Sequence, residues 1–138
     1  MGKWKALLEA MKIITGVSAQ HNKALRDVRD WAVTIREFLY VYNLYGDYSL
    51  SSLSKNIGDV KFDLINITYK GRSLVKAARK IKGKQVAPLI EKLDDSLENL
   101  RRVLINPTLR STRLNEAVLG LRMSFEELQD TLTDLDYM

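Results

Sequence analysis

The sequence predicts an all-α protein, an elongated antiparallel helical bundle with coiled-coil-like packing. Apolar residues recur every three or four positions along most of the chain, which is the period of helices that lie against other helices. Charged residues make up 28% of the chain, and only two prolines are present to interrupt helices. With 138 residues, 46% of them hydrophobic, the chain is long enough to bury the core of one domain, 1–138.

The first predicted helix covers about residues 3–45. Its apolar stripe shifts around the helix near Gly16, where two steps of three residues follow one another. Gly46 is the expected C-terminal stop, because glycine readily takes the left-handed conformation that ends helices. The stripe consists of Trp4, Leu7, Met11, Ile14, Val17, His21, Ala24, Val28, Trp31, Ile35, Phe38, Tyr42 and Tyr45.

The second predicted helix covers about residues 49–82 and has the most regular stripe. Asp47 or Ser49 is the expected N-cap, and Gly83 is the expected end. This stripe has two small members, Gly71 and Ala78, and another backbone could come close at these positions. The members of the stripe are Leu50, Leu53, Ile57, Val60, Leu64, Ile67, Gly71, Leu74, Ala78 and Ile81.

Two further helices are predicted at about 86–105 and 108–136. Pro88 suits the first turn of the third helix, and Asn106 followed by Pro107 indicates a break before the fourth. The third stripe is Val86, Ile90, Leu93, Leu97, Leu100 and Leu104. The fourth stripe is Leu114, Val118, Leu121, Phe125, Leu128, Leu132 and Leu135.

The helix lengths leave two architectures open. At 1.5 Å per residue the first two helices would extend roughly 60 and 50 Å. The third and fourth together match the first, and the heptad spacing continues through Pro107, so they could form one rod that is broken at Asn106-Pro107. We slightly favour this bundle of three long rods over an up-and-down bundle of four helices.

The sequence offers no residue pattern for catalysis or for binding a metal or cofactor. Cysteine is absent, and the glycines stand singly, so neither a usual zinc site nor a phosphate-binding loop is present. A di-iron site needs Glu-x-x-His pairs, whereas the single histidine, His21, has no acid three residues before it. We therefore expect no enzyme activity, no metal and no cofactor. His21 is expected to be packed or at the rim, with pH sensing or ligand binding as its alternative.

Charge is unevenly distributed along the chain, whose formal net charge is +5. One positive segment without any acid, here called the basic stripe, comprises Lys70, Arg72, Lys76, Arg79, Lys80, Lys82 and Lys84. The fourth helix is acidic, and its acidic face comprises Glu126, Glu127, Asp130 and Asp134. Without a neighbouring base or pocket, we expect these carboxylates to form a solvated helix face rather than a catalytic site.

Three interpretations of the basic stripe stay open. It could be a solvated face that the acidic fourth helix of the same chain partly neutralises. It could dock on the acidic end of another copy, which would give a head-to-tail or staggered homo-oligomer. It could also bind the phosphates of a nucleic acid or an anionic lipid, without reading sequence.

Two apolar surfaces complete the list of candidate sites. The end of the first helix is apolar on every side, so it is either wrapped by neighbouring helices or forms a protein interface. The interface residues would be Phe38, Tyr40, Tyr42, Tyr45 and Tyr48. Segment 1–15 has apolar residues flanked by Lys3, Lys5 and Lys12, and it could lie on a membrane surface or form the first turns of a core helix.

The sequence predicts neither a signal peptide nor a membrane span. Glu9 and Lys12 interrupt what would have to be the apolar part of a signal peptide. The longest dense apolar stretch, Phe38 to Tyr45, is much shorter than the roughly 20 residues that a spanning helix needs. The expected location is the cytoplasm or the interior of a macromolecular assembly.

The heptad pattern predicts a non-enzymatic structural or adaptor protein that acts through helix–helix contacts within an oligomer or larger assembly. The rod shape and the segment LNEAVLGLRMSFEELQDTLTDLD resemble, in fold and composition alone, helical accessory proteins of secretion machines and phage particles. The alternative function is sequence-independent nucleic-acid binding through the basic stripe. A second alternative is peripheral membrane binding through segment 1–15.

Overall fold

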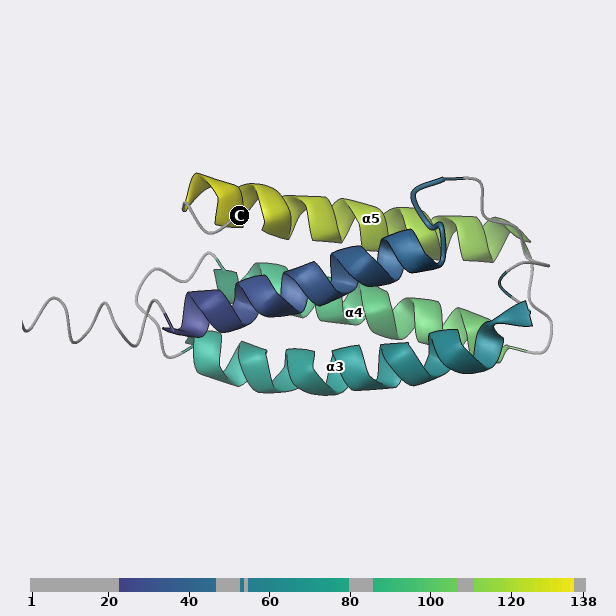
Figure 1. Ribbon diagram of the computed structural model, residues 1–138, viewed down its shortest axis with the longest axis horizontal. Coiled ribbons are helices and arrows are strands. Elements are labelled where there is room, and N and C mark those ends of the chain that lie inside the picture. Colours follow the sequence, from purple (N-terminus) through teal and green to yellow (C-terminus); the bar gives the residue numbers. More distant parts are fainter. Residues whose placement is uncertain (1–22, 47–52, 54, 80–85, 107–110, 136–138) are drawn as a thin grey trace, which may run out of the picture.

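The computed structural model describes residues 23–46, 53, 55–79, 86–106 and 111–135. Within these residues the structure has four helices and no strand, which confirms the predicted all-α class. Figure 1 shows the helices lying along one another in an elongated bundle. They cover residues 23–41, here called the first helix, α3 (Ile57–Arg79), α4 (Val86–Ile105) and α5 (Ser111–Asp134).

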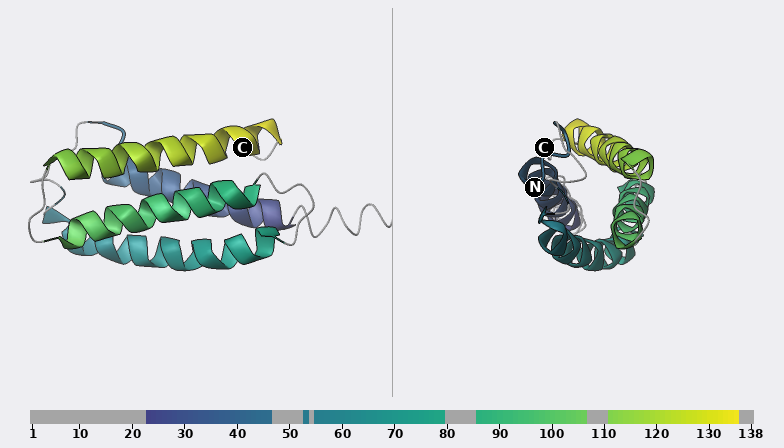
Figure 2. Two further views of the ribbon diagram at one scale, coloured as in Figure 1. Left: turned by 180° about the vertical axis from the view of Figure 1, so that it is seen from behind. Right: turned by 90° about the vertical axis from the view of Figure 1, so that its right-hand side faces the viewer.

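Each helix runs antiparallel to the next, so the bundle is of the up-and-down type. Seen end on, the four helices occupy the corners of a square, and α4 lies between α3 and α5 (Figure 2). As a result, α3 and α5 lie at opposite corners of the square and run in the same direction (Figures 1 and 2). The outward sides of α3 and α5 therefore face in opposite directions.

The four-helix alternative is confirmed, and the favoured arrangement of three long rods is wrong. Instead of continuing as one rod, α4 and α5 fold back against each other. The Ser96 and Ser124 hydroxyl oxygens lie 2.8 Å apart, and Lys92 Nζ lies 2.7 Å from Glu127 Oε2. The periodicity continues across the break, but helical conformation is disfavoured at a residue that precedes proline, and Asn106 lies outside the helices.

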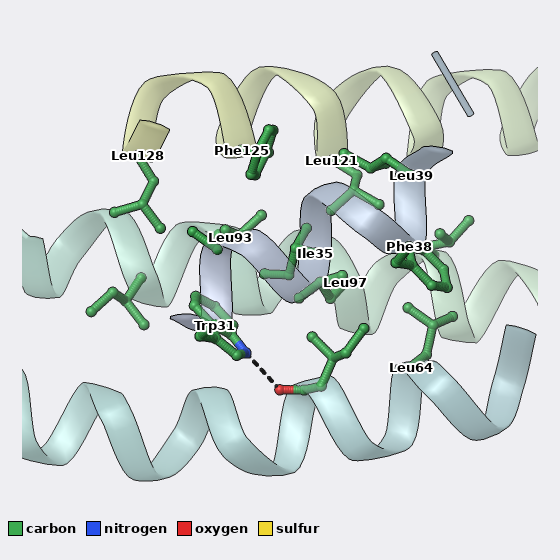
Figure 3. Packing of buried hydrophobic residues seen from close by; sticks show 14 of the residues in the cluster. Trp31, Ile35, Phe38, Leu39, Leu64, Leu93, Leu97, Leu121, Phe125 and Leu128 are labelled. Atoms are coloured by element: carbon green, nitrogen blue, oxygen red, sulfur yellow. Dashed lines mark hydrogen bonds between the residues drawn. The ribbon is translucent and has the colours of Figure 1, made fainter. Parts of the chain in front are cut away.

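One hydrophobic core fills the middle of the bundle. Figure 3 shows side chains from all four helices pointing toward one another, among them Trp31, Leu64, Leu97 and Phe125. Every described member of the α3 and α4 stripes is buried or half-buried, as predicted. The α5 stripe is buried as far as Leu132, whereas its expected last member, Leu135, follows the end of the helix and is 42% exposed.

The first helix ends at residue 41 rather than at 45, and Asn43 rather than Gly46 is the stop. Asn43 has a positive φ of 55°, a conformation that asparagine tolerates better than most residues. The Leu44 N–H donates to the Leu39 carbonyl at 2.7 Å, and the Asn43 N–H donates to the Tyr40 carbonyl at 3.1 Å. These two bonds define a Schellman motif, which buries Leu44 at the end of the core.

The other helix bounds agree with prediction to different degrees. The bounds of α4 are the predicted ones. In the second predicted helix, Leu53 and Lys55 are helical, Asn56 is a turn, and α3 begins at Ile57, so the described part of this helix is interrupted at Asn56. At the start of α3 the Asn56 carbonyl accepts a hydrogen bond from the Val60 N–H at 2.9 Å. The described bounds of α5 lie within the predicted 108–136. The expected caps Asp47, Ser49 and Gly83 lie outside the described residues, as do segment 1–15 and His21.

At Gly71, side chains of the neighbouring helices lie close against α3. A Cβ atom on Gly71 would lie 2.6 Å from Asp94 Oδ1 and 2.7 Å from Trp31 Cζ2. We expected another backbone to come close here, but the atoms that fill this space belong to side chains. The Trp31 ring is held there because its Nε1–H donates to the Ile67 carbonyl at 2.9 Å (Figure 3).

Candidate interaction surface

The outward side of α3 has a second apolar row, separate from the core stripe. Phe62, Ile65 and Tyr69 follow one another at spacings of three and four, which places them on one helix face. Their exposed fractions are 65%, 51% and 78%. Arg72 and Lys76 continue the same spacing and are also exposed. We call these five residues, Phe62, Ile65, Tyr69, Arg72 and Lys76, the outer α3 stripe.

The described part of the basic stripe lies on α3 and is exposed: Lys70, Arg72, Lys76 and Arg79. Arg79 Nη2 lies 3.3 Å from Glu91 Oε1 on α4, and the positive charge of Arg72 acts on the Asp94 carboxyl, also on α4. The negative groups near these two arginines therefore belong to α4, whereas the interpretation as a solvated face placed them on the fourth helix. That helix, α5, lies at the opposite corner of the bundle (Figure 2). The remaining members, Lys80, Lys82 and Lys84, lie outside the described residues.

The outward side of α5 also has its own row. Leu119 and Met123 are 54% and 61% exposed, and they lie between acidic residues on the same face. All four predicted members of the acidic face are exposed, and Glu127 forms an ion pair with Lys92 of α4. The outer α5 stripe is defined as Glu116, Leu119, Met123, Glu126 and Asp130, all of them exposed.

The aromatic end of the first helix is mostly wrapped by neighbouring elements. Phe38 is only 3% exposed, so its predicted place in a surface interface is wrong, and it belongs to the core. The Tyr42 hydroxyl donates to Asp63 Oδ2 of α3 at 2.6 Å. Burial, followed by this bond to the negatively charged Asp63, raises the pKa of Tyr42 to about 12. Tyr42 therefore anchors the first helix to α3.

Tyr45 joins the same end to α5. The Arg122 guanidinium lies 4.8 Å from the centre of the Tyr45 ring, an arrangement that attracts the cation to the ring face. Burial and the nearby Glu126 carboxylate raise the pKa of Tyr45 to about 12. Of the predicted interface, Tyr40 is the described residue that is largely exposed, at 66%, and it stacks on Tyr45. Tyr48 lies outside the described residues.

Asp94 is the most perturbed carboxyl in the described part of the chain. It is half-buried between α3 and α4, and its Oδ1 atom has no hydrogen-bond partner. Burial raises the pKa of Asp94 to about 6, while the nearby Arg72 acts in the opposite direction. Among the described residues, no three His, Cys, Asp or Glu side chains gather to hold a metal ion. Asp94 thus affects stability at a helix contact, and among the described residues it belongs to no cluster that could hold a metal ion.

Sequence reasoning found the charged halves of the two outer stripes but missed their apolar halves. Phe62, Ile65, Leu119 and Met123 are not part of any predicted surface. The signal that would have found them is a second row of spacings of three and four on each helix, opposite the core stripe.

None of the helices in the described ranges is both long enough and apolar enough to cross a membrane. In comparisons with known proteins, no family model, no curated protein and no solved structure matches the chain. The candidate surface is therefore argued from its own residues.

Proposed function

We propose that the protein is a non-enzymatic structural or adaptor component that acts through helix–helix contacts within an oligomer or larger assembly. The observation that carries this proposal is the row of Phe62, Ile65 and Tyr69, each more than half exposed. The opposite side of the same helix is already buried in the core. Single exposed apolar residues are ordinary, but a row at helical spacing is the pattern by which a helix recognises a partner.

Nucleic-acid binding is the competing function, and one observation favours it. Tyr69 is exposed next to Lys70 and close to Arg72 and Lys76, and such a combination can contact phosphates and stack on bases. Protein contact explains the surface better, because the same face has further large apolar side chains that phosphate binding does not require. Two arginines of the basic stripe also have acidic neighbours on α4.

The substitution Ile65→Lys distinguishes the two functions, because it should weaken protein association but strengthen nucleic-acid binding. A lysine in the apolar row would place a charge in a helix–helix contact, so we expect the chain to lose self-association or binding to its assembly partners. Nucleic-acid binding predicts the opposite, because an added positive charge strengthens contact with phosphates. The measurements are solution mass by light scattering over a range of concentrations, and binding of labelled single-stranded and duplex DNA at two salt concentrations.

The matched control is Asn99→Lys, which adds the same charge on the exposed outward side of α4. It should leave association unchanged, and circular dichroism should show the same helix content in both variants. The proposal is overturned if Ile65→Lys associates as the unaltered chain does. It is also overturned if the unaltered chain is a monomer that binds DNA with a steep salt dependence.

A further inference from the structure

The two outer stripes have the same spacing and complementary chemistry. The outer α3 stripe steps by three, four, three and four residues from Phe62 to Lys76, and the outer α5 stripe does the same from Glu116 to Asp130. In both helices the large apolar members precede the last two charged ones. Those last two charges are positive on α3 and negative on α5. Two helix faces of this kind match when the helices lie parallel and in register.

We infer that the outer α3 stripe of one copy of the chain binds the outer α5 stripe of a second copy, with the two helices parallel. This inference rests on the proposed function and names the partner of the same surface. The two stripes cannot meet within one chain, because α3 and α5 lie at opposite corners of the bundle and face outward (Figure 2). A second copy of the chain can present the missing partner stripe.

In this register, apolar side chains face apolar side chains in one half of the contact. In the other half, positive side chains face negative ones. Ile65 faces Leu119, and Tyr69 faces Met123, so side chains that are 51% to 78% exposed in the single chain become covered. At the end of the contact Phe62 lies beside the aliphatic stem of Glu116, whose carboxylate stays in water.

In the charged half of the contact, Arg72 faces Glu126, and Lys76 faces Asp130. Opposite charges at these positions select the parallel orientation and the register, as charged residues do in coiled coils. An antiparallel arrangement would place charges against the apolar rows.

The geometry also predicts the form of the assembly. Because α3 and α5 are parallel and face opposite ways, a second copy reaches the contact by a shift with little rotation (Figures 1 and 2). Such a head-to-tail contact does not close on itself, so the row always has one free stripe at each of its two ends. One helix pair buries less surface than a standard interface, so each contact is weak and the row grows with concentration.

Two charge reversals test the pairing. Lys76→Glu would place a carboxylate at position 76 against Asp130, and Asp130→Lys would place an ammonium group at position 130 against Lys76. Each variant alone is therefore expected to associate roughly tenfold less strongly or worse. In an equimolar mixture both kinds of contact between unlike copies join opposite charges again, whereas contacts between identical copies stay repulsive. Association through alternating copies should therefore recover most of the way to that of the unaltered chain. The control is Lys23→Glu on the first helix, an exposed charge reversal outside both outer stripes, which should leave association unchanged.

The readout is weight-average mass by light scattering, with circular dichroism to show that each variant keeps its helix content. Recovery in the mixture, together with species larger than a dimer in the unaltered chain, supports the inference. Failure of the mixture to recover overturns it, and so does growth of the unaltered chain that stops at a dimer. If Ile65→Lys still weakens association in that case, the proposed contact function stands and only the identity of its partner surface is wrong. Loss of DNA binding by Lys76→Glu without any change in mass would overturn both.

Discussion

At the scale of single residues, Gly71 leaves room against α3 for the side chains of Asp94 and Trp31. We expect Gly71→Ala to destabilise the bundle by about 1–2 kcal/mol, although alanine in a helix usually gains about 1 kcal/mol over glycine. Asp94 can turn away from the new Cβ, but the Trp31 ring is fully buried and held by its bond to the Ile67 carbonyl. The measurement is the free energy of unfolding in urea. Gly120→Ala is the control, because a Cβ there meets nothing within 4 Å.

The control variant is expected to gain roughly 0.5–1 kcal/mol, which is the ordinary advantage of alanine inside a helix. If Gly71→Ala raised the free energy of unfolding as much as Gly120→Ala does, this would contradict the close packing of side chains against position 71.

Asp94 supplies a second prediction at this scale, on pH. Its pKa is raised to about 6 in the folded chain from an ordinary value of 3.8, so between these pH values the folded state binds more protons than the unfolded state. Stability contributed by this group therefore falls as pH rises from about 4 to about 6, and the penalty is fully present above that range. Asp94→Asn removes the penalty.

We expect Asp94→Asn to unfold with a free energy higher by about 1 kcal/mol at pH 8, a modest value because solvent screens a half-buried carboxyl. Near pH 3.5 the difference from the unaltered chain should vanish. Thermal or urea unfolding at the two pH values measures it, and Asp95→Asn, which removes an exposed neighbouring carboxylate, should have a smaller effect. An Asp94→Asn chain that is no more stable at pH 8 would contradict the assignment.

At the scale of elements, local signals predicted some helix bounds well and missed others. The bounds of α4 follow from Pro88 in its first turn and from Asn106 before Pro107, because proline restricts its own backbone and that of the residue before it. The end of the first helix was missed because Asn43 and Gly46 can both take a left-handed conformation. Burial of Leu44 in the core, which depends on packing against the other helices, favours the stop at Asn43.

The candidate surface could likewise be predicted only in part, because some of its residues are recognisable only once the packing of the helices is known. The core stripes follow from one periodic pattern, so Leu64 and Leu97 were predicted to be buried, and they are. A second pattern on the outward side of the same helix is recognisable only once the inward side is known. Phe62 and Met123 were missed for that reason. Periodicity likewise could not decide between three rods and four helices, because the heptad continues through Pro107, whereas the pairing of α4 with α5 depends on contacts between distant residues.

At the scale of the whole molecule, the inferred pairing predicts how salt changes assembly. In the unaltered chain the charged half of the contact joins opposite charges, so screening by added salt should weaken association moderately while the apolar half persists. In the double variant Arg72→Glu, Lys76→Glu both positions bring like charges together. Screening then removes a repulsion, so salt should strengthen the association of this variant. Light scattering between about 50 and 500 mM salt measures both trends, a range over which the screening length falls severalfold.

The opposite signs of the two salt trends are the specific outcome of this pairing. A purely apolar contact would give the same salt dependence in both chains, since no charge at position 76 would then face another charge across the contact. Phosphate binding would weaken with salt in both chains, and more steeply than a contact between two proteins with only two ion pairs. A reversal of the sign by these two exposed substitutions therefore requires negative groups opposite positions 72 and 76, and the outer α5 stripe of a second copy places Glu126 and Asp130 there.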